Sequence, residues 1–366
     1  MNCKLVTLAL LISQVGFAES QYTHWINYTT ANGMPDDKVT SVAIDHERVW
    51  AGTENGLVLL VGGRIERVFQ PADGLAHRFV TGVAVDSKTG DVWISTFGGL
   101  SQYSGGHFHN YSSSSSGLAN DIVYGVGLQG DNVWAATTAG ISRLNVRTGE
   151  WTVFSERNAP LHEPWSYGIS VSDKKVYVAV WGGGMLEFDI AGEYWKPYND
   201  PDGEMEIVLF RNQGLIHDIV SSVSWNPDSK MVWASTYFGL SGYDGRNWHN
   251  YLSTDSGVAS DFINAAKSVG PYVWACTDKG LSRLNFKDNT WETYRVNAQS
   301  GRGEIIMTDG NGKVTKRETP TALAHSYILN IDVQNDDIWV ATAKGLSHGT
   351  ISHKENESHA NLRSRR

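Results

Sequence analysis

Residues 273–284 read VWACTDKGLSRL, and the core of this phrase occurs seven times along the 366-residue chain. Each copy has a β-branched residue and an aromatic residue, then a run of small residues, then Gly and an apolar residue. The copies are Val49-Trp50…Gly56-Leu57, Val92-Trp93…Gly99-Leu100, Val133-Trp134…Gly140-Ile141, Val176-Tyr177…Gly184-Met185, Val232-Trp233…Gly239-Leu240, Val273-Trp274…Gly280-Leu281 and Ile338-Trp339…Gly345-Leu346. Their aromatic residues are 43, 41, 43, 56, 41 and 65 positions apart. A period near 40 residues in such a sequence is typical of propeller blades.

The third repeat shows how one blade is built. The alternating residues 122–128 predict its innermost strand, and residues 133–137, 141–145 and 150–154 predict the second, third and outermost strands. A single sheet of this kind cannot cover both of its faces, so each blade must pack on its neighbours.

The outermost strands share two aromatic residues three positions apart, and this pair indicates how the ring closes. The pairs are Phe108/Tyr111, Trp151/Phe154, Trp195/Tyr198, Trp248/Tyr251 and Trp291/Tyr294. The last repeat lacks such a pair, whereas Trp25 and Tyr28 supply one near the N-terminus. We therefore predict an all-β, seven-bladed β-propeller of four-stranded blades, in which residues 22–30 complete the last blade. Closure in this way removes exposed sheet edges.

Two repeats carry extra residues before their innermost strand, at 199–213 and at 297–321. In propellers the loops between blades lie on the same face as the turns between second and third strands. Both insertions are therefore expected around the mouth of the central channel. Within the second insertion, residues 304–315 predict a hairpin whose turn contains Asn311-Gly312.

Residues 1–18 predict a secretory signal peptide, with Lys4, an apolar run from residue 5, and small residues at Gly16 and Ala18 that suit cleavage after Ala18. The apolar run is too short to span a bilayer, and no later one is long enough. We expect a signal peptide at 1–18, a propeller at 19–352 and a flexible tail at 353–366. The protein is expected in the periplasm or outside the cell.

Composition narrows the choice of partners and chemistry. The formal net charge of −9 argues against nucleic acid and anionic lipid as partners. Cys3 lies in the signal peptide and Cys276 is alone in a strand, where a small buried residue is expected. Residues 200–204 and 309–312 resemble the start of calcium loops but lack the distal Glu. The sequence therefore predicts no metal and no cofactor, and no catalytic residue is assigned.

The phrase in residues 273–284 resembles the two-component regulator propeller repeat, and the resemblance covers essentially the whole chain after residue 18. It implies a seven-bladed propeller in an extracytoplasmic sensor. Many members respond to carbohydrates, often through a membrane span and a histidine kinase. We find no span, kinase or response-regulator segment in this sequence, so the resemblance implies fold and compartment more firmly than signalling.

Large aromatic residues that the repeat does not require point to a recognition surface. Of fourteen Trp residues, eleven occupy repeat positions and are expected between blades, and Trp225 is expected in the core. The remaining two, Trp165 and Trp181, fall in the fourth repeat. With Tyr237 and Phe238 they predict an aromatic patch at the channel mouth, unless they pack beneath the loop at 199–213.

Polar residues recur where each innermost strand starts. They either cap backbone amides or form a polar channel mouth that binds a hydroxylated or cationic ligand. The candidate ligand-binding residues from both groups are Trp165, Trp181, Tyr237, Phe238, Phe97, Tyr167, Glu163, Arg78, Asp121, Asp218, Asp261, His77, His217 and His325.

Two classes of function fit these residues. The leading hypothesis is a non-enzymatic, monomeric propeller that binds a small ligand, such as a carbohydrate, or an envelope protein at the channel mouth, as a sensor or scaffold. The alternative is a propeller lyase or hydrolase that uses His77, His217 and His325 with acidic residues at the same face.

Overall fold

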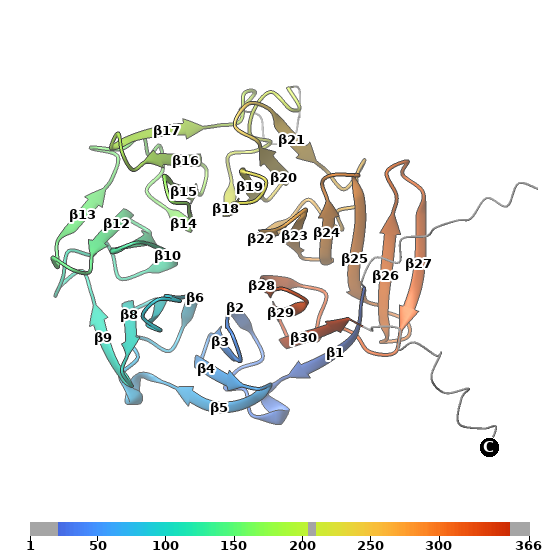
Figure 1. The fold of residues 1–366 in the computed structure, drawn as a ribbon, viewed down its shortest axis with the longest axis horizontal. Coiled ribbons are helices and arrows are strands. Elements are labelled where there is room, and N and C mark those ends of the chain that lie inside the picture. Colours follow the sequence, from blue (N-terminus) through green and yellow to red (C-terminus); the bar gives the residue numbers. More distant parts are fainter. Residues whose placement is uncertain (1–20, 204–209, 352–366) are drawn as a thin grey trace, which may run out of the picture.

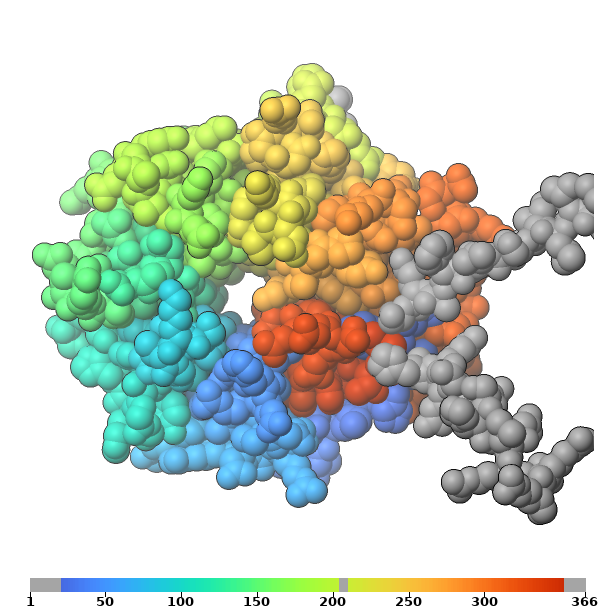
Figure 2. Space-filling model, in the orientation of Figure 1, coloured from blue at the N-terminus to red at the C-terminus, as the bar shows by residue number. Residues whose placement is uncertain are grey.

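The computed structural model describes residues 21–203 and 210–351, and it is a ring of seven antiparallel sheets (Figure 1). This confirms the seven-bladed β-propeller. The space-filling view shows an opening at the centre of the ring (Figure 2). The predicted signal peptide and tail lie outside the described residues. No helix of the described chain is long and apolar enough to cross a membrane.

Each blade runs from an innermost strand at the channel to an outermost strand at the rim. The strands of blades 1 to 4 are β2 (Val39–Asp45), β3 (Arg48–Thr53), β4 (Gly56–Val61) and β5 (Arg64–Phe69); β6 (Val80–Val85), β7 (Val92–Thr96), β8 (Gly99–Ser104) and β9 (His107–Tyr111); β10 (Val123–Gln129), β11 (Asn132–Thr137), β12 (Gly140–Asn145) and β13 (Trp151–Phe154); and β14 (Ser166–Val171), β15 (Lys175–Val180), β16 (Gly184–Asp189) and β17 (Tyr194–Tyr198).

Blades 5 to 7 repeat this plan, with an extension in blade 6. Their strands are β18 (Val220–Asn226), β19 (Met231–Thr236), β20 (Gly239–Tyr243) and β21 (Trp248–Tyr251); β22 (Ile263–Val269), β23 (Tyr272–Thr277), β24 (Gly280–Asn285), β25 (Thr290–Val296), β26 (Gly303–Thr308) and β27 (Val314–Thr319); and β28 (Ile328–Gln334), β29 (Asp337–Thr342), β30 (Gly345–Ile351) and β1 (Tyr22–Tyr28). Two short 3-10 helices cover Thr30–Asn32 and Pro71–Asp73.

The insertion at 297–321 does form the predicted hairpin, but it does not lie at the channel mouth. Strand β26 pairs antiparallel with β25 from Val296↔Gly303 to Trp291↔Thr308, and so continues blade 6 outward to six strands (Figure 1). The expectation of a channel-mouth loop is therefore wrong for this insertion. The unpaired outer edge of β25 offers backbone hydrogen bonds, which the hairpin satisfies.

The N-terminal strand closes the ring as predicted. Strand β1 pairs with β30, with Trp25 opposite Gly349 and Tyr28 opposite Leu346. The Tyr28 ring stacks on Trp339 at 5.5 Å, and its hydroxyl donates to the Gly63 carbonyl of blade 1 at 2.7 Å. The first strand therefore joins the last blade and contacts the first.

Aromatic packing between blades forms much of the core. The six Trp residues of the second strands are at most 2% exposed. Rings of the fourth strands also meet across adjacent blades, as in Tyr111–Trp151 at 5.6 Å and Tyr251–Trp291 at 5.5 Å. Cys276 is fully buried, and burial raises the pKa of its thiol. Trp225 differs from the prediction: it is only partly buried and lines a cavity described below.

Candidate ligand-binding site at the channel mouth

Each blade presents two side chains at the mouth, one just before the innermost strand and one in the turn after the second strand. The amide of the turn residue donates to the carbonyl of the pre-strand residue in six of the blades, for example Phe97 N to Phe79 O at 3.2 Å. These pairs are Phe79/Phe97, Ile122/Thr138, Trp165/Trp181, Ile219/Tyr237, Phe262/Asp278 and Tyr327/Ala343. In blade 1 the corresponding residues, Lys38 and Glu54, form a salt bridge of 2.6 Å. These mouth positions are thus mostly aromatic or aliphatic, with the Lys38–Glu54 ion pair at blade 1 and Asp278 at blade 6 as the charged groups.

The turn of blade 4 departs from the other six. Their second strands end in a Thr whose hydroxyl donates to the carbonyl of the turn Gly at 2.7–2.9 Å. Blade 4 has Val180 in that place, and its turn is one residue longer. Gly182 and Gly184 take left-handed conformations, with φ of +73° and +76°, which favour glycine. Trp181 takes the same turn position as Phe97 and Tyr237, and the additional residue is one of the glycines at 182–184. Blade 4 therefore lacks the Thr cap and carries Trp181 directly after Val180.

Eight aromatic rings follow one another around the mouth from blade 2 to blade 7. Successive ring centroids are 4.3, 5.7, 4.3, 5.0, 4.7, 3.9 and 6.5 Å apart along Phe79, Phe97, Tyr124, Tyr167, Trp181, Tyr237, Phe262 and Tyr327. Tyr124 and Tyr167 are nearly parallel, at 12°. We call these eight residues the aromatic belt.

Tyr124 and Tyr167 occupy a position that has a structural role elsewhere in the ring. In blades 1, 2, 5 and 6 the same position holds Thr40, Thr81, Ser221 and Asn264, whose side chains donate to a carbonyl of the next blade at 2.5–2.7 Å. The two tyrosines of blades 3 and 4 instead stack on each other. Fold stability alone does not require tyrosine there, because smaller hydrogen-bonding residues serve the other blades.

A cavity of about 490 Å³ lies within the ring and is lined by six members of the aromatic belt, all except Trp181 and Phe262. This volume falls in the ordinary range for small-molecule sites. Hydroxyl and amide groups line it as well, from Thr40, Ser41, Thr81, Ser221, Ser222, Asn264 and Asn330. The buried Ser41 hydroxyl has no hydrogen-bond partner among the described residues. The cavity therefore combines flat apolar walls with hydroxyl and amide groups, and Lys38 is the one charged residue among the described residues that line it.

The aromatic residues expected at the mouth do lie there, but only some of them belong to the aromatic belt. Tyr167, Trp181, Tyr237 and Phe97 belong to the belt. Trp165 is 48% exposed and lies beside Trp181, whose amide donates to its carbonyl at 2.9 Å. Phe238 stacks on the His217 imidazole at 4.2 Å, outside the belt.

The three histidines hold the backbone at the start of their innermost strands. The Nδ1 atoms of His77, His217 and His325 accept from the amide two residues later at 2.9–3.0 Å. Asn120 does the same with its side-chain oxygen at 2.8 Å. Burial lowers the pKa of His217, and burial, with Lys344, lowers that of His325. The neutral imidazole suits this acceptor role.

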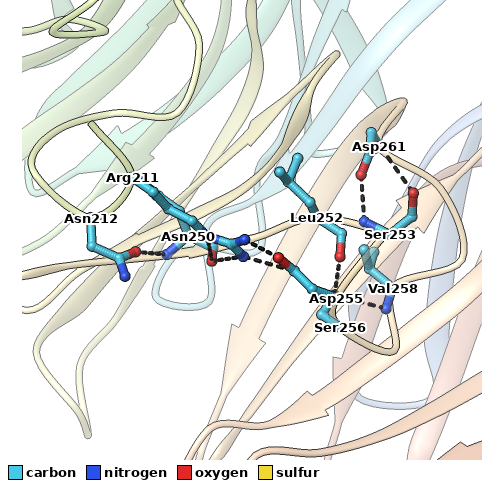
Figure 3. Close-up of polar contacts among 9 residues, drawn as sticks. All are labelled: Arg211, Asn212, Asn250, Leu252, Ser253, Asp255, Ser256, Val258 and Asp261. Atoms are coloured by element: carbon cyan, nitrogen blue, oxygen red, sulfur yellow. Dashed lines mark hydrogen bonds and ion pairs between the residues drawn. The ribbon is translucent and has the colours of Figure 1, made fainter. Parts of the chain in front are cut away.

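The acidic candidates also contact backbone amides. Asp121 accepts from Ser113 N at 2.6 Å, Asp218 from Asp200 N at 2.8 Å, and Asp261 from Ser253 N at 2.6 Å (Figure 3 shows the last). Each contact ties an inter-blade loop to the following blade. Arg78 and Glu163 are exposed, and Glu163 lies next to the blade 4 turn.

The described ends of the insertion at 199–213 attach to blades 4 and 5. Asn199 Nδ2 donates to Gly183 O at 3.3 Å, and Arg211 forms an ion pair with Asp255 and donates to the Asn250 carbonyl at 2.8 Å (Figure 3). Arg211 therefore lies beside the outer part of blade 5. Residues 204–209 are outside the described chain.

Four members of the belt were not among the predicted residues: Phe79, Tyr124, Phe262 and Tyr327. Each is adjacent in sequence to a fully buried residue that begins an innermost strand. Aligning the repeats on that buried residue would have brought them together. The prediction compared polar residues at these starts and so passed over their aromatic neighbours.

The described residues contain no group of three or more His, Cys, Asp or Glu side chains arranged to hold a metal ion. No protein-family model matches the chain, and no curated protein matches it.

Solved structures with the same fold include two extracellular domains from B. thetaiotaomicron. One belongs to a protein described as the hybrid two-component system BT3049, with 17% identity and a TM-score of 0.67 over 90% of this chain and 42% of that one. The other belongs to a protein described as the one-component system BT4673, with 18% identity and a TM-score of 0.63 over 90% of this chain and 40% of that one. This chain has the propeller fold of these domains. It spans less than half of their length.

The resemblance to the two-component regulator propeller repeat is thereby confirmed at the level of the fold. A catalytically inactive virginiamycin B lyase from Staphylococcus aureus, solved with quinupristin, is also similar, with 12% identity and a TM-score of 0.63 over 90% of this chain and 99% of that one. The same fold therefore occurs in the extracellular domain of a two-component system and in an enzyme, and fold alone does not choose between them.

Proposed function

We propose that this chain is an extracytoplasmic binding module that takes a neutral oligosaccharide at the channel mouth. The observation that carries the proposal is the aromatic belt, above all the stacked Tyr124–Tyr167 pair and the adjoining Trp181. Tyr124 and Tyr167 stand where four other blades have small hydrogen-bonding residues, and Trp181 follows Val180, which replaces the capping Thr of the other six blades. Stacking surfaces have replaced structural contacts in neighbouring blades.

The chemistry of the cavity fits a sugar. The faces of a pyranose ring present C–H groups, which pack on flat aromatic rings, and its edges carry hydroxyl groups. Thr81, Ser222 and Asn330 are among the residues whose side chains match those hydroxyls. Lys38, the charged residue of the cavity lining, is neutralised by a salt bridge of 2.6 Å to Glu54. An uncharged, hydroxyl-rich ligand is therefore favoured over an ionic one.

A sensor role in the periplasm or outside the cell is supported by the compartment of the structural neighbours, which are extracellular domains. The predicted signal peptide at 1–18 agrees with export. The chain would then report ligand to an envelope partner, since the neighbouring domains belong to proteins described as two-component and one-component systems.

Binding is favoured over lyase or hydrolase activity by the contacts of the histidines. The Nδ1 atoms of His77, His217 and His325 are each engaged by a backbone amide, and none of these imidazoles is hydrogen-bonded to a carboxylate among the described residues. In a Ser-His-Asp triad, by contrast, a buried carboxylate orients the catalytic imidazole.

A thermal-shift screen with neutral trisaccharides tests the proposal. We would use maltotriose, cellotriose, mannotriose, xylotriose and N,N′,N″-triacetylchitotriose, and expect at least one to raise the melting temperature by mass action. The Trp181→Ala variant should weaken that binding by about 1–3 kcal/mol. Tyr194→Ala is the matched control, because Tyr194 is 56% exposed on the outermost strand β17. Equal binding by both variants would contradict the proposed site.

A further inference from the structure

A second cavity of about 490 Å³ lies between blades 4 and 5, on the face opposite the channel mouth. It is lined by the turn that joins β14 to β15, at residues 172–174, and by Pro227 and Gly245 from two turns of blade 5. These turns connect strands at the end of the blade away from Trp181. The cavity is therefore separate from the aromatic belt.

Two substitutions within the repeat give this cavity an aromatic wall. Blade 4 has Tyr177 where the other second strands have Trp, and blade 5 has Trp225 where the other innermost strands have Ile44, Val85, Leu128, Val171, Ser268 and Val333. Tyr177 and Trp225 stack at 5.6 Å and 15°. Tyr198 and Tyr243 continue the wall, with centroids 5.2 Å apart.

Not all of the tyrosine hydroxyl groups in this wall form a side-chain hydrogen bond. Tyr198 donates to Glu187 at 2.9 Å, whereas Tyr177 and Tyr243 make no side-chain hydrogen bond among the described residues. Burial, and then the charge of Glu187, raises the pKa of Tyr177, so its hydroxyl stays protonated. Tyr177 therefore offers a free donor at the cavity wall.

The rim of the cavity is cationic in a chain whose net charge is −9. Lys174, Lys175, Lys196 and Lys230 all line it. Lys175 is paired with the buried Glu187 at 2.5 Å, and the Lys196 ammonium lies 4.6 Å from the centre of the Tyr198 ring. The exposed ammonium groups of Lys174 and Lys230 contact no carboxylate among the described residues, and Asp173 is the remaining acid of the lining.

We propose that the blade 4–5 cavity is a second binding site, for a small anion that carries a ring, of the sugar-acid class. The Tyr177–Trp225 stack supplies a flat face for the ring, and Lys174 and Lys230 supply cations for the carboxylate. The volume suits a mono- or disaccharide acid better than a polymer segment, because the turns around it limit its length. The proposal stands independently of the channel-mouth site, which has a different charge and face.

Isothermal titration with D-glucuronate and D-galacturonate tests this proposal, with D-glucose as the neutral probe and benzoate as an aromatic acid. We expect a uronate to bind, glucose to bind at least about tenfold more weakly, and affinity to fall with added salt. Benzoate binding as tightly as the uronates would assign the site to ring-bearing anions in general. Absence of binding by all three acids at millimolar concentration would overturn the proposal.

Charge-matched variants locate the site. The double variant Lys174→Ala/Lys230→Ala should weaken uronate binding about tenfold or more, because it removes both free cations. The control Lys88→Ala/Lys313→Ala removes two exposed lysines from blades 2 and 6 and should leave the affinity unchanged. Trp181→Ala should also leave it unchanged. Equal loss of uronate affinity in both double variants would mean that only the net charge of the protein matters, and would refute a site in this cavity. Loss of affinity in Trp181→Ala would instead place the uronate at the channel mouth.

Discussion

Replacing Trp25 by alanine tests the closure of the ring by the N-terminal strand. Trp25 is 5% exposed, and its ring lies 6.0 Å from Tyr294 of blade 6 and 6.1 Å from Tyr22. Its partner across the strands is Gly349, which has no side chain to fill the space left behind. A buried Trp→Ala change of this kind costs roughly 3–5 kcal/mol of unfolding free energy.

The neighbouring residue provides the control for this measurement. Ile26 lies on the same strand, points away from the core and is 44% exposed. We expect Ile26→Ala to cost less than about 1 kcal/mol, because exposed positions lose few contacts. Urea unfolding followed by circular dichroism, at equal m-values, gives both free energies. A cost for Trp25→Ala no larger than that for Ile26→Ala would refute the closed ring.

Three further predictions follow from the same structure. Tyr124→Thr should keep the fold, because Thr40 and Thr81 make the inter-blade hydrogen bond at this position, yet it should weaken trisaccharide binding; a melting curve and a titration of the variant check both parts. Burial lowers the pKa of His217, so the folded state binds fewer protons than the unfolded state, and stability should hold above about pH 6.5 and fall as the pH drops below it. In the His217→Asn variant the side-chain oxygen can still accept the backbone hydrogen bond, as that of Asn120 does, but it does not titrate. Urea unfolding at several pH values should therefore show a smaller loss of unfolding free energy at low pH. An unchanged pH profile would mean that another group takes up the proton. Replacing residues 299–319 by a short Gly-Ser loop should expose the edge of β25 and remove the buried Ile305, which pairs with Tyr294. We expect a lower melting temperature and association in light scattering, and an unchanged, monomeric protein would contradict the role of the hairpin.

The repeat predicted the fold well because each blade has the same side-chain requirements. Residues 122–128 were expected as an innermost strand and β10 covers Val123–Gln129, and the aromatic pair missing from the last repeat located the closing strand β1. The path of the 297–321 insertion was not predictable in this way. A hairpin pattern shows that two strands pair with each other, but it does not show that their outer edge pairs with β25.

The site was predicted only in part, for a related reason. Trp181 was recognisable because it breaks the repeat, and Tyr167 because it lies close to it. Tyr124 and Phe262 fit the alternation of an innermost strand and carry no such signal. Their contacts depend on the ring geometry, which brings Tyr124 to 4.3 Å from Tyr167 and Phe262 to 3.9 Å from Tyr237, each in the neighbouring blade.

The most direct test of the channel-mouth site is the affinity of the Tyr167→Ala/Trp181→Ala double variant for whichever neutral trisaccharide binds the wild-type protein. Both side chains are partly exposed, so the fold should persist, which circular dichroism verifies. Isothermal titration should show binding weakened by at least about tenfold, while Tyr194→Ala binds as the wild type does. An unchanged dissociation constant in the double variant would contradict ligand binding by the aromatic belt.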